Sequence, residues 1–294
     1  MTHTQQPSTP ATPHASRFDA WPISPRLLPT LTLKELRDAL SNKWVVLFTV
    51  AFAALALGLA ALARASAGMT GFAGFGRTAA SLVNLVLLLT PLMALSVGAT
   101  SIVTERERGM LGYLLAQPVS RTEVFLAKYL GLALAMTAAI AIGFGVSALS
   151  LGGAGDGALF LRLAALSALL AYAMLAVGML ISALLRRTGS AVGVAVFTWL
   201  TLALLADIGI LGAAMLSRLR TETLFFVTLA NPLQAFKMSS LAGFGAGLDV
   251  LGPVGVWATT EFGSALPALL LSSLVAWIVV PLVAAWAVFR RRPL

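Results

Sequence analysis

The stretch that decides the fold class is residues 159–185, LFLRLAALSALLAYAMLAVGMLISALL, in which Arg162 is the only charged residue. A helix needs about 20 mostly apolar residues to cross the hydrocarbon core of a bilayer, so this stretch is long enough to span it. Apolar and polar residues do not alternate along it, as they would in a strand of a membrane barrel. We therefore predict a transmembrane α-helix here.

Five further stretches of the same kind occur along the 294 residues. They are residues 44–63, 79–103, 129–151, 191–216 and 266–289. The whole chain is 59% hydrophobic and 11% charged, with a mean hydropathy of +0.93, whereas soluble domains carry roughly a quarter charged residues. We predict an all-α, polytopic membrane protein with six transmembrane helices.

The basic residues are distributed unevenly between the two sides of the predicted membrane. Their excess gives a net charge of +9, which in a membrane protein points first to the cytoplasmic side and not to nucleic acid. With the N-terminus inside, fourteen of the 20 basic residues fall in inner segments, and the other six are Arg64, Arg77, Arg162, Arg218, Arg220 and Lys237. We predict that both termini are cytoplasmic, that residues 217–265 form a periplasmic region and that the protein lies in the bacterial inner membrane. We expect it to contact membrane lipid and not nucleic acid.

Two segments precede the first span. Residues 1–28 are rich in Pro, Thr and Ser without an apolar core, which predicts a disordered cytoplasmic tail and no cleavable signal peptide. In residues 29–43, Thr32 and Glu35 have the spacing of a T-x-x-E capping box, and leucines recur on one helical face. We predict a helix on the cytoplasmic surface that opens a permease domain of residues 29–294. The alternative is a simple extension of the first span.

The most informative cytoplasmic segment is residues 104–128, TERERGMLGYLLAQPVSRTEVFLAK. We expect its four leading charges to end the second helix in water and Gly109 to break that helix. A stripe of apolar residues at helical spacing then predicts a short helix that Pro118 ends, and the S-x-x-E pattern of Ser120 and Glu123 predicts the start of the third span. The stripe consists of Met110, Leu111, Leu114 and Leu115. An apolar stripe beside a membrane requires a covering partner, either lipid headgroups or another protein.

These residues resemble the cytoplasmic coupling segment of type 2 ABC exporter permeases. The residues that carry the resemblance are Glu105, Glu107, Gly109, Leu114, Leu115, Pro118, Val119, Arg121 and Lys128. Leu111 of the apolar stripe is a further candidate for coupling to the ATPase. Six spans, a preceding surface helix and a large outer region before the last span agree with that family over nearly the whole chain. The resemblance implies that this segment docks on a separate ATPase, and that the fold is a type 2 ABC exporter transmembrane domain.

A narrower resemblance is to the permeases that serve copper-site maturation of periplasmic nitrous-oxide reductase. It rests on Lys34, Glu35, Leu36, Asp38, Leu40, Lys43, Trp44, Asp207, Asn231, Pro232, Ala235 and Phe236. Lys237 departs from it, because an arginine is expected at that position. The resemblance implies a periplasmic partner, for which we predict Asn231, Pro232, Phe236 and Lys237 as contacts.

The chain has no nucleotide site of its own by sequence. None of its four lysines follows a glycine, so the G-x-x-x-x-G-K-[ST] motif is absent. We expect no enzymatic activity and no cofactor in this chain, with ATP and Mg²⁺ bound by the partner ATPase and two copies of the chain forming a homodimer. Gly189 with Gly193, and Gly178 with Ser182, have the small-x-x-x-small spacing of close helix packing, within the chain or at a dimer seam.

Asp207 is the only acid well inside a predicted span. It either lies in a solvated outer vestibule or takes part in gating or pairing, because a charge in hydrocarbon is costly. Soft metal ligands are not clustered: cysteine is absent, the two histidines lie in the tail, and the methionines are scattered. We predict no metal site.

Three classes of function fit these patterns to different degrees. The coupling segment supports equally a permease for metalloenzyme assembly and an ABC exporter permease for another cargo, such as a drug, a lipid or an ion. An intramembrane enzyme is poorly supported, because no embedded His, Cys or pair of acids offers a nucleophile or metal ligands.

Overall fold

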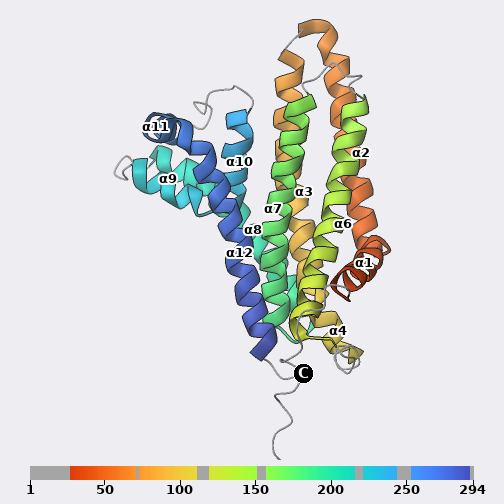
Figure 1. Cartoon of the computed structure of the whole chain (residues 1–294). Helices are drawn as coiled ribbons and strands as arrows, with labels where there is room; N and C mark the ends of the chain where they lie inside the picture. The colour runs from red at the N-terminus through yellow and green to blue at the C-terminus, as the bar shows by residue number, and fades with distance from the viewer. Residues whose placement is uncertain are drawn as a thin grey trace, which may run out of the picture.

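A computed structural model describes residues 27–70, 73–110, 119–150, 157–215, 221–243 and 253–291 (Figure 1). Within these ranges the side chains of residues 63–70, 73–80, 150, 206–215, 243 and 253 are not described. The N-terminal tail therefore lies outside the described residues, and its disorder stays a prediction.

The described chain is helical, and six of its helices are long and apolar enough to cross a membrane. They are α2 (Lys43–Thr70), α3 (Ala73–Ser101), α6 (Arg121–Ser150), α7 (Gly157–Leu184), α8 (Thr188–Met215) and α12 (Leu266–Arg291). A short helix, α4 (Val103–Glu107), follows α3, and α12 continues from α11 (Pro253–Phe262) through the 3₁₀ turn η3 (Gly263–Ala265). The predicted all-α fold with six spans is confirmed.

The helix α7 lies at the centre of the bundle, against α3 and α12 (Figure 1). A Cβ built on Gly98 would lie 2.6 Å from the carbonyl oxygen of Leu175, and one on Gly178 equally close to that of Leu95. The backbones of α3 and α7 therefore touch, as glycines allow between membrane helices. For Gly178 and its neighbour Ser182, close packing within the chain is the confirmed interpretation.

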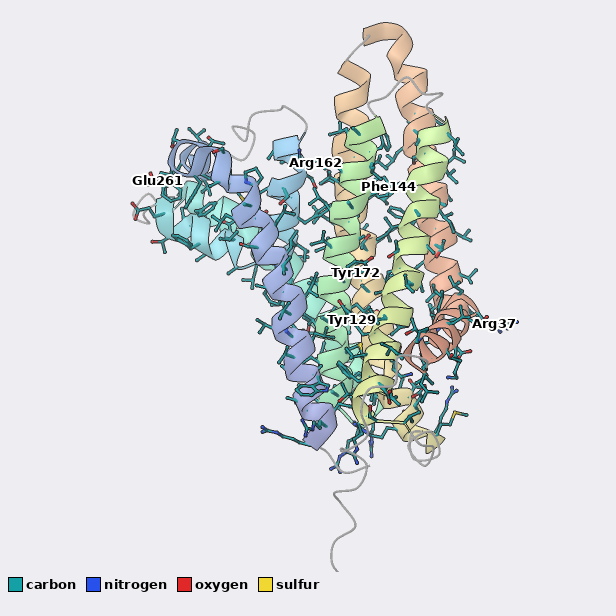
Figure 2. All side chains as sticks on the ribbon, viewed as in Figure 1. Arg37, Tyr129, Phe144, Arg162, Tyr172 and Glu261 are labelled. Carbon is teal, nitrogen blue, oxygen red and sulfur yellow. The ribbon has the colours of Figure 1, made fainter. Side chains whose placement is uncertain are left out.

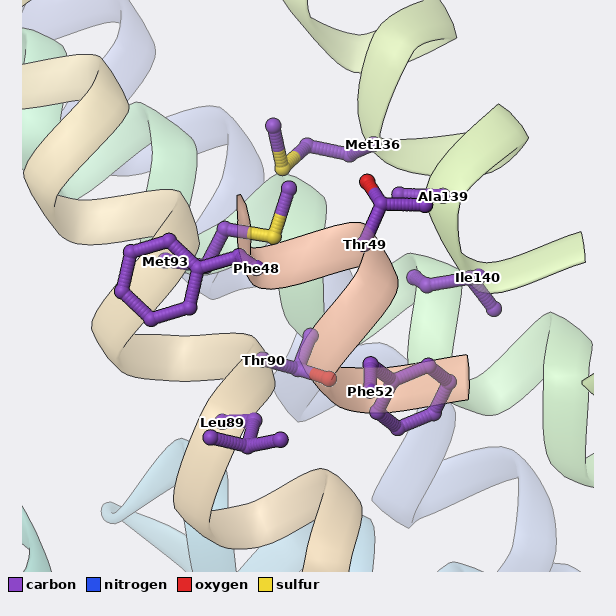
Figure 3. Close-up of a pocket in the computed structure, with 9 residues that line it drawn as sticks. All are labelled: Phe48, Thr49, Phe52, Leu89, Thr90, Met93, Met136, Ala139 and Ile140. Atoms are coloured by element: carbon purple, nitrogen blue, oxygen red, sulfur yellow. The ribbon is translucent and has the colours of Figure 1, made fainter. Parts of the chain in front are cut away.

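Polar contacts join α6 to α7 inside the bundle. Tyr129 and Tyr172 lie between these helices (Figure 2), and the hydroxyl of Tyr172 is 2.6 Å from that of Thr137. Between α2, α3 and α6 a cavity of about 20 Å³ remains, into which the thioethers of Met93 and Met136 point (Figure 3). Flexible methionine side chains fill such gaps between helices well, so we assign this cavity to packing.

The surface helix α1 (Leu27–Leu40) packs on α6 and is separate from α2. Asn42 ends the connection, because its side-chain oxygen accepts the N–H of Trp44 at 2.9 Å and caps α2. The alternative of a simple extension of the first span is therefore wrong. The predicted capping box is also wrong: α1 begins at Leu27, so Thr32 lies inside the helix.

The face of α1 that meets α6 is not the predicted leucine face. Leu33 is 66% exposed, whereas Ala39 is buried. A Cβ on Gly131 of α6 would lie 2.6 Å from the Cβ of Glu35 and 2.9 Å from the carbonyl oxygen of Thr32. The glycine therefore lets the two helices approach at backbone distance.

Between α8 and α12 lie α9 (Thr221–Leu229) and α10 (Pro232–Gly243). Both lie within the predicted outer region of residues 217–265, and α10 packs against α12, α7 and α3. Helices α9 and α11 form a lobe at the end of the molecule opposite α4 (Figure 1). Its aromatic core is centred on Phe225, whose ring centroid is 5.4 Å from that of Trp257 and 5.3 Å from that of Phe262.

Candidate functional site

A buried lysine joins three helices at the α4 end of the bundle. The Lys128 ammonium, on α6, is 2.8 Å from a carboxylate oxygen of Glu35 on α1 and 2.7 Å from one of Glu105 on α4. Its side chain is 4% exposed. Charge-assisted hydrogen bonds to two carboxylates offset the cost of removing the ammonium from water. We call Lys128, Glu35 and Glu105 the charge cluster.

The same face of α1 connects the charge cluster to the surface. The second carboxylate oxygen of Glu35 is 3.2 Å from the ammonium of Lys34, which also pairs with Asp38 at 3.1 Å. Partial burial lowers the pKa of Lys34, but the neighbouring carboxylates outweigh it and raise that pKa above its ordinary value. Lys34 therefore stays charged beside Glu35 at neutral pH.

The helix α4 is also attached to the turn between α7 and α8. Arg106 donates to the carbonyl oxygen of Leu185 at 3.1 Å, near the C-terminus of α7. The backbone N–H of Thr188, at the start of α8, donates to the Glu107 carboxylate at 3.0 Å, and the Thr188 hydroxyl donates to the same oxygen. A carboxylate at a helix N-terminus and a cation at a C-terminus both complement the helix dipole.

These contacts correct one expectation from the sequence. Glu105, Arg106 and Glu107 do not simply end the second helix in water, because each contacts another part of the chain. Gly109 does break the helix as predicted, with φ of +71°, a conformation that favours glycine. A Cβ there would meet no described atom within 4 Å, and the positive φ is the feature that calls for glycine.

The far end of the segment is fixed by the predicted second capping box. The Ser120 N–H and hydroxyl donate to the Glu123 carboxylate at 2.8 and 2.9 Å, and the Glu123 N–H donates to the Ser120 hydroxyl at 3.1 Å. This reciprocal pattern confirms the box. Arg121 donates to the carbonyl oxygen of Arg290 at 3.1 Å, which joins the start of α6 to the end of α12.

The residues between these two ends lie outside the described part of the chain. They include Leu111, Leu114, Leu115 and Pro118. The apolar stripe and its short helix therefore stay predictions. The structure describes the two anchors from which residues 111–118 extend.

The four residues predicted to contact a periplasmic partner lie at the start of α10. Asn231 caps this helix: its side-chain oxygen accepts the Leu233 N–H at 3.0 Å, and its amide donates to the carbonyl oxygen of Leu202 at 2.8 Å. Pro232 and Phe236 are buried, and only Lys237 is partly exposed. The partner contact stays a prediction, and Lys237 is the one of the four that presents surface.

Two further sequence predictions are tested by the structure only in part. Asp207 lies on α8, and its side chain is outside those described, so its role stays open. A Cβ on Gly189 or Gly193 of α8 would meet none of the described atoms within 4 Å, unlike one on Gly178. Among the described residues no group of three His, Cys, Asp or Glu side chains comes together as metal ligands would.

Lys128 was predicted to belong to the coupling segment, but its ion pairs with Glu35 and Glu105 were not predicted. A lysine at the membrane end of an apolar helix requires an acid nearby, and that was the available signal. Glu35 is 93 residues away in the chain, so spacing alone does not identify it.

Comparison with known proteins shows which proteins this chain is similar to in sequence. A model of the ABC-2 family transporter proteins matches residues 30–294. The probable ABC transporter permease protein NosY of Stutzerimonas stutzeri is 35% identical over 271 residues, which cover 88% of this chain and 96% of that protein. The protein of the same name in Pseudomonas aeruginosa is 34% identical over 277 residues, which cover 90% and 98%.

Proposed function

This chain belongs to the ABC-2 family of transporter proteins and is the permease subunit of an ABC transporter, and we propose that it couples ATP hydrolysis by a separate ATPase to transport or to mechanical action on a periplasmic partner. A permease of this kind is the membrane component and not the ATPase itself. In this proposal ATP and Mg²⁺ are bound by the ATPase subunit.

The observation that carries the coupling role is the double anchoring of residues 104–128. On one side α4 is joined to α1 and α6 through the charge cluster, and to the turn between α7 and α8 through Arg106 and Glu107. On the other side Arg121 is joined to the end of α12. A force applied to residues 111–118 is therefore transmitted through hydrogen bonds and ion pairs to five helices. They are α1, α6, α7, α8 and α12.

The relatives named NosY supply the closer proposal for the biological role. We propose a homodimer of this chain in the inner membrane, with a NosF-like ATPase on the cytoplasmic side and a NosD-like partner in the periplasm. The complex would act in copper-site maturation of nitrous-oxide reductase. The similarity to the Stutzerimonas stutzeri protein covers 88% of this chain and 96% of that protein. Similarity over nearly the full length of both proteins supports the same biological role.

Purification of the tagged full-length chain from its native membrane, followed by mass spectrometry, tests the assembly. We expect an ABC ATPase and a periplasmic protein in the same complex, with ATPase activity. An ATPase without a periplasmic partner would favour the alternative, an exporter permease for a drug, lipid or ion. A chain that purifies without any ATPase would contradict the coupling proposal.

The maturation role has its own test. A strain that lacks this chain should make nitrous-oxide reductase protein with incomplete copper centres, visible in its absorption and electron paramagnetic resonance spectra. Complementation with the wild-type chain should restore those spectra. Normal copper centres in the deletion strain would exclude this role while leaving the permease assignment intact.

A further inference from the structure

A second polar feature lies away from α4, where α3, α8 and α10 meet. It is a pocket with about 210 Å³ of free space. Its lining consists of Asn84, Leu87, Leu88, Trp199, Ala203, Leu233, Gln234 and Lys237. No residue of the charge cluster contributes to it, so the pocket is distinct from the candidate coupling site.

Lys237 is the single cation that α10 presents to this pocket. The other nine residues from 231 to 240 are buried, and Lys237 alone is partly exposed. The hydrogen bond from Asn231 to the Leu202 carbonyl places the start of α10 near the middle of α8. Lys237 therefore lies within the depth of the spans, where an ammonium is costly unless it faces a polar ligand, protein or water.

The wall of the pocket carries a cation, a buried N–H group and the carboxamides of Asn84 and Gln234. The indole N–H of Trp199 is buried and has no hydrogen-bond acceptor in the described part of the chain. Among the side chains that the structure describes, no carboxylate lies within 4.0 Å of the Lys237 ammonium, since the ion pairs found all involve Lys34 or Lys128. Asn84 adds an exposed carboxamide at the rim. A buried donor without an acceptor is unfavourable, so a ligand that accepts a hydrogen bond fits beside Trp199, and the Lys237 ammonium favours a ligand that carries negative charge.

We propose that this pocket binds an anion that carries an apolar chain. The ammonium of Lys237 and the indole N–H of Trp199 bind the phosphate, sulfonate or carboxylate head. Leu87, Leu88 and Leu233 line the path of the apolar part. The ligand is either an anionic lipid of the surrounding membrane or a separate anionic amphiphile, because both present this chemistry. The inference goes beyond the proposed coupling role and does not depend on ATPase docking.

Calorimetric titration of the full-length chain in phosphatidylcholine nanodiscs tests the proposal, with decyl phosphate as the probe, decanol as its uncharged counterpart and empty nanodiscs as the blank. Lys237→Gln should raise the Kd for decyl phosphate about tenfold or more, because a hydrogen bond to a charged group is worth at least one factor of ten. Trp199→Phe, which removes one N–H donor to the same charged head, should also raise it about tenfold or more. The matched control is Lys43→Gln, at an exposed lysine outside the pocket, and it should leave the Kd unchanged.

Two further measurements complete the test. Leu88→Trp fills the mouth of the pocket without removing the cation and should abolish binding; Leu88 is 51% exposed, so this variant should fold. Replacing part of the lipid with phosphatidylglycerol raises the apparent Kd for decyl phosphate if lipid is the natural occupant, and leaves it unchanged if the ligand is a separate amphiphile. Equal binding of decyl phosphate by wild type and Lys237→Gln, equal affinity for decanol, or no binding to the wild type would overturn the proposal.

Discussion

The charge cluster places an ammonium and two carboxylates where little water reaches them. Lys128 is 4% exposed, Glu35 13% and Glu105 22%, measured on the side chains. Each charge is tolerable only because its partners are present, since an unpaired buried charge carries its full desolvation cost. The cluster is therefore more sensitive to the loss of one member than to the loss of all three charges.

Lys128→Met should destabilise the protein by about 3 to 5 kcal/mol, because it removes the cation that Glu35 and Glu105 share and leaves only the more exposed Lys34 beside Glu35. The melting temperature of the purified chain, followed by its intrinsic fluorescence, should fall accordingly. Lys43→Met, at an exposed position, provides the control and should melt like the wild type.

A compensating variant separates charge balance from side-chain volume. Adding Glu35→Gln and Glu105→Gln to Lys128→Met removes every charge of the cluster at nearly constant shape. We expect most of the lost stability to return. If the triple variant melts as low as Lys128→Met alone, the cost lies in packing, and the electrostatic account of this cluster is wrong.

The two capping boxes show what local sequence can and cannot predict at the scale of single residues. The S-x-x-E pattern of Ser120 and Glu123 forms as expected at the start of α6. The T-x-x-E pattern of Thr32 and Glu35 does not form, since the helix begins at Leu27 and Glu35 pairs with Lys128 instead. A contact across 93 residues overrides the local preference.

The docking of α1 on α6 is the element-scale feature most open to a direct test. Gly131 lies at the crossing, where a Cβ would approach the backbone nitrogen of Leu36 to 2.9 Å. Backbone atoms cannot rotate away as a side chain can. A larger residue at this position must therefore push α1 off α6.

Gly131→Leu should expose Ala39, which is 6% exposed in the wild type. The chain lacks cysteine, so Ala39→Cys gives a single reporter that a maleimide labels only when α1 lifts. We expect slow labelling in the Ala39→Cys protein and fast labelling once Gly131→Leu is added. Gly145→Leu is the matched control, because a Cβ at Gly145 meets no atom within 4 Å. Fast labelling without Gly131→Leu, or equal protection with it, would contradict the observed docking.

The six spans were predictable and α10 was not, for a physical reason. A span is a local property: each one is an apolar run long enough to cross a bilayer. The helix α10 has only 12 residues and includes Gln234, Lys237, Ser239 and Ser240, so its sequence resembles a loop. Contacts with α3, α7 and α12 hold it, and such contacts are not visible in local composition.

At the scale of the whole molecule, the described ends of the chain share one end of the bundle with α4 (Figure 1). The positive-inside rule predicts that this end is cytoplasmic. Alkaline phosphatase fused after Leu294 should therefore be inactive, and the same enzyme fused within residues 217–265 should be active. A green fluorescent protein fusion at each site should give the opposite result. Active phosphatase after Leu294 would reverse the predicted topology.

Coupling also belongs to the whole molecule, because it requires that an ATPase outside the membrane moves helices inside it. The described anchors on both sides of residues 111–118 provide the connection to α1, α6, α8 and α12. The predicted apolar stripe would provide the surface to which the ATPase binds. Leu114 is its central member, so a change there should break the assembly without disturbing the bundle.

Leu114→Asp should release the ATPase while the chain still reaches the membrane at normal abundance. A leucine buried in a protein groove contributes roughly 1.5 to 3 kcal/mol, and a carboxylate in the same groove adds a desolvation cost. Since about 1.4 kcal/mol is tenfold in affinity, the ATPase should be lost at least about tenfold on co-purification. The control Ala11→Asp adds the same charge to the predicted cytoplasmic tail and should keep a full complement of ATPase. If the Leu114→Asp protein retains its ATPase and normal activity, residues 104–128 are not the coupling element, and the double anchoring of α4 and α6 serves only to close the end of the bundle.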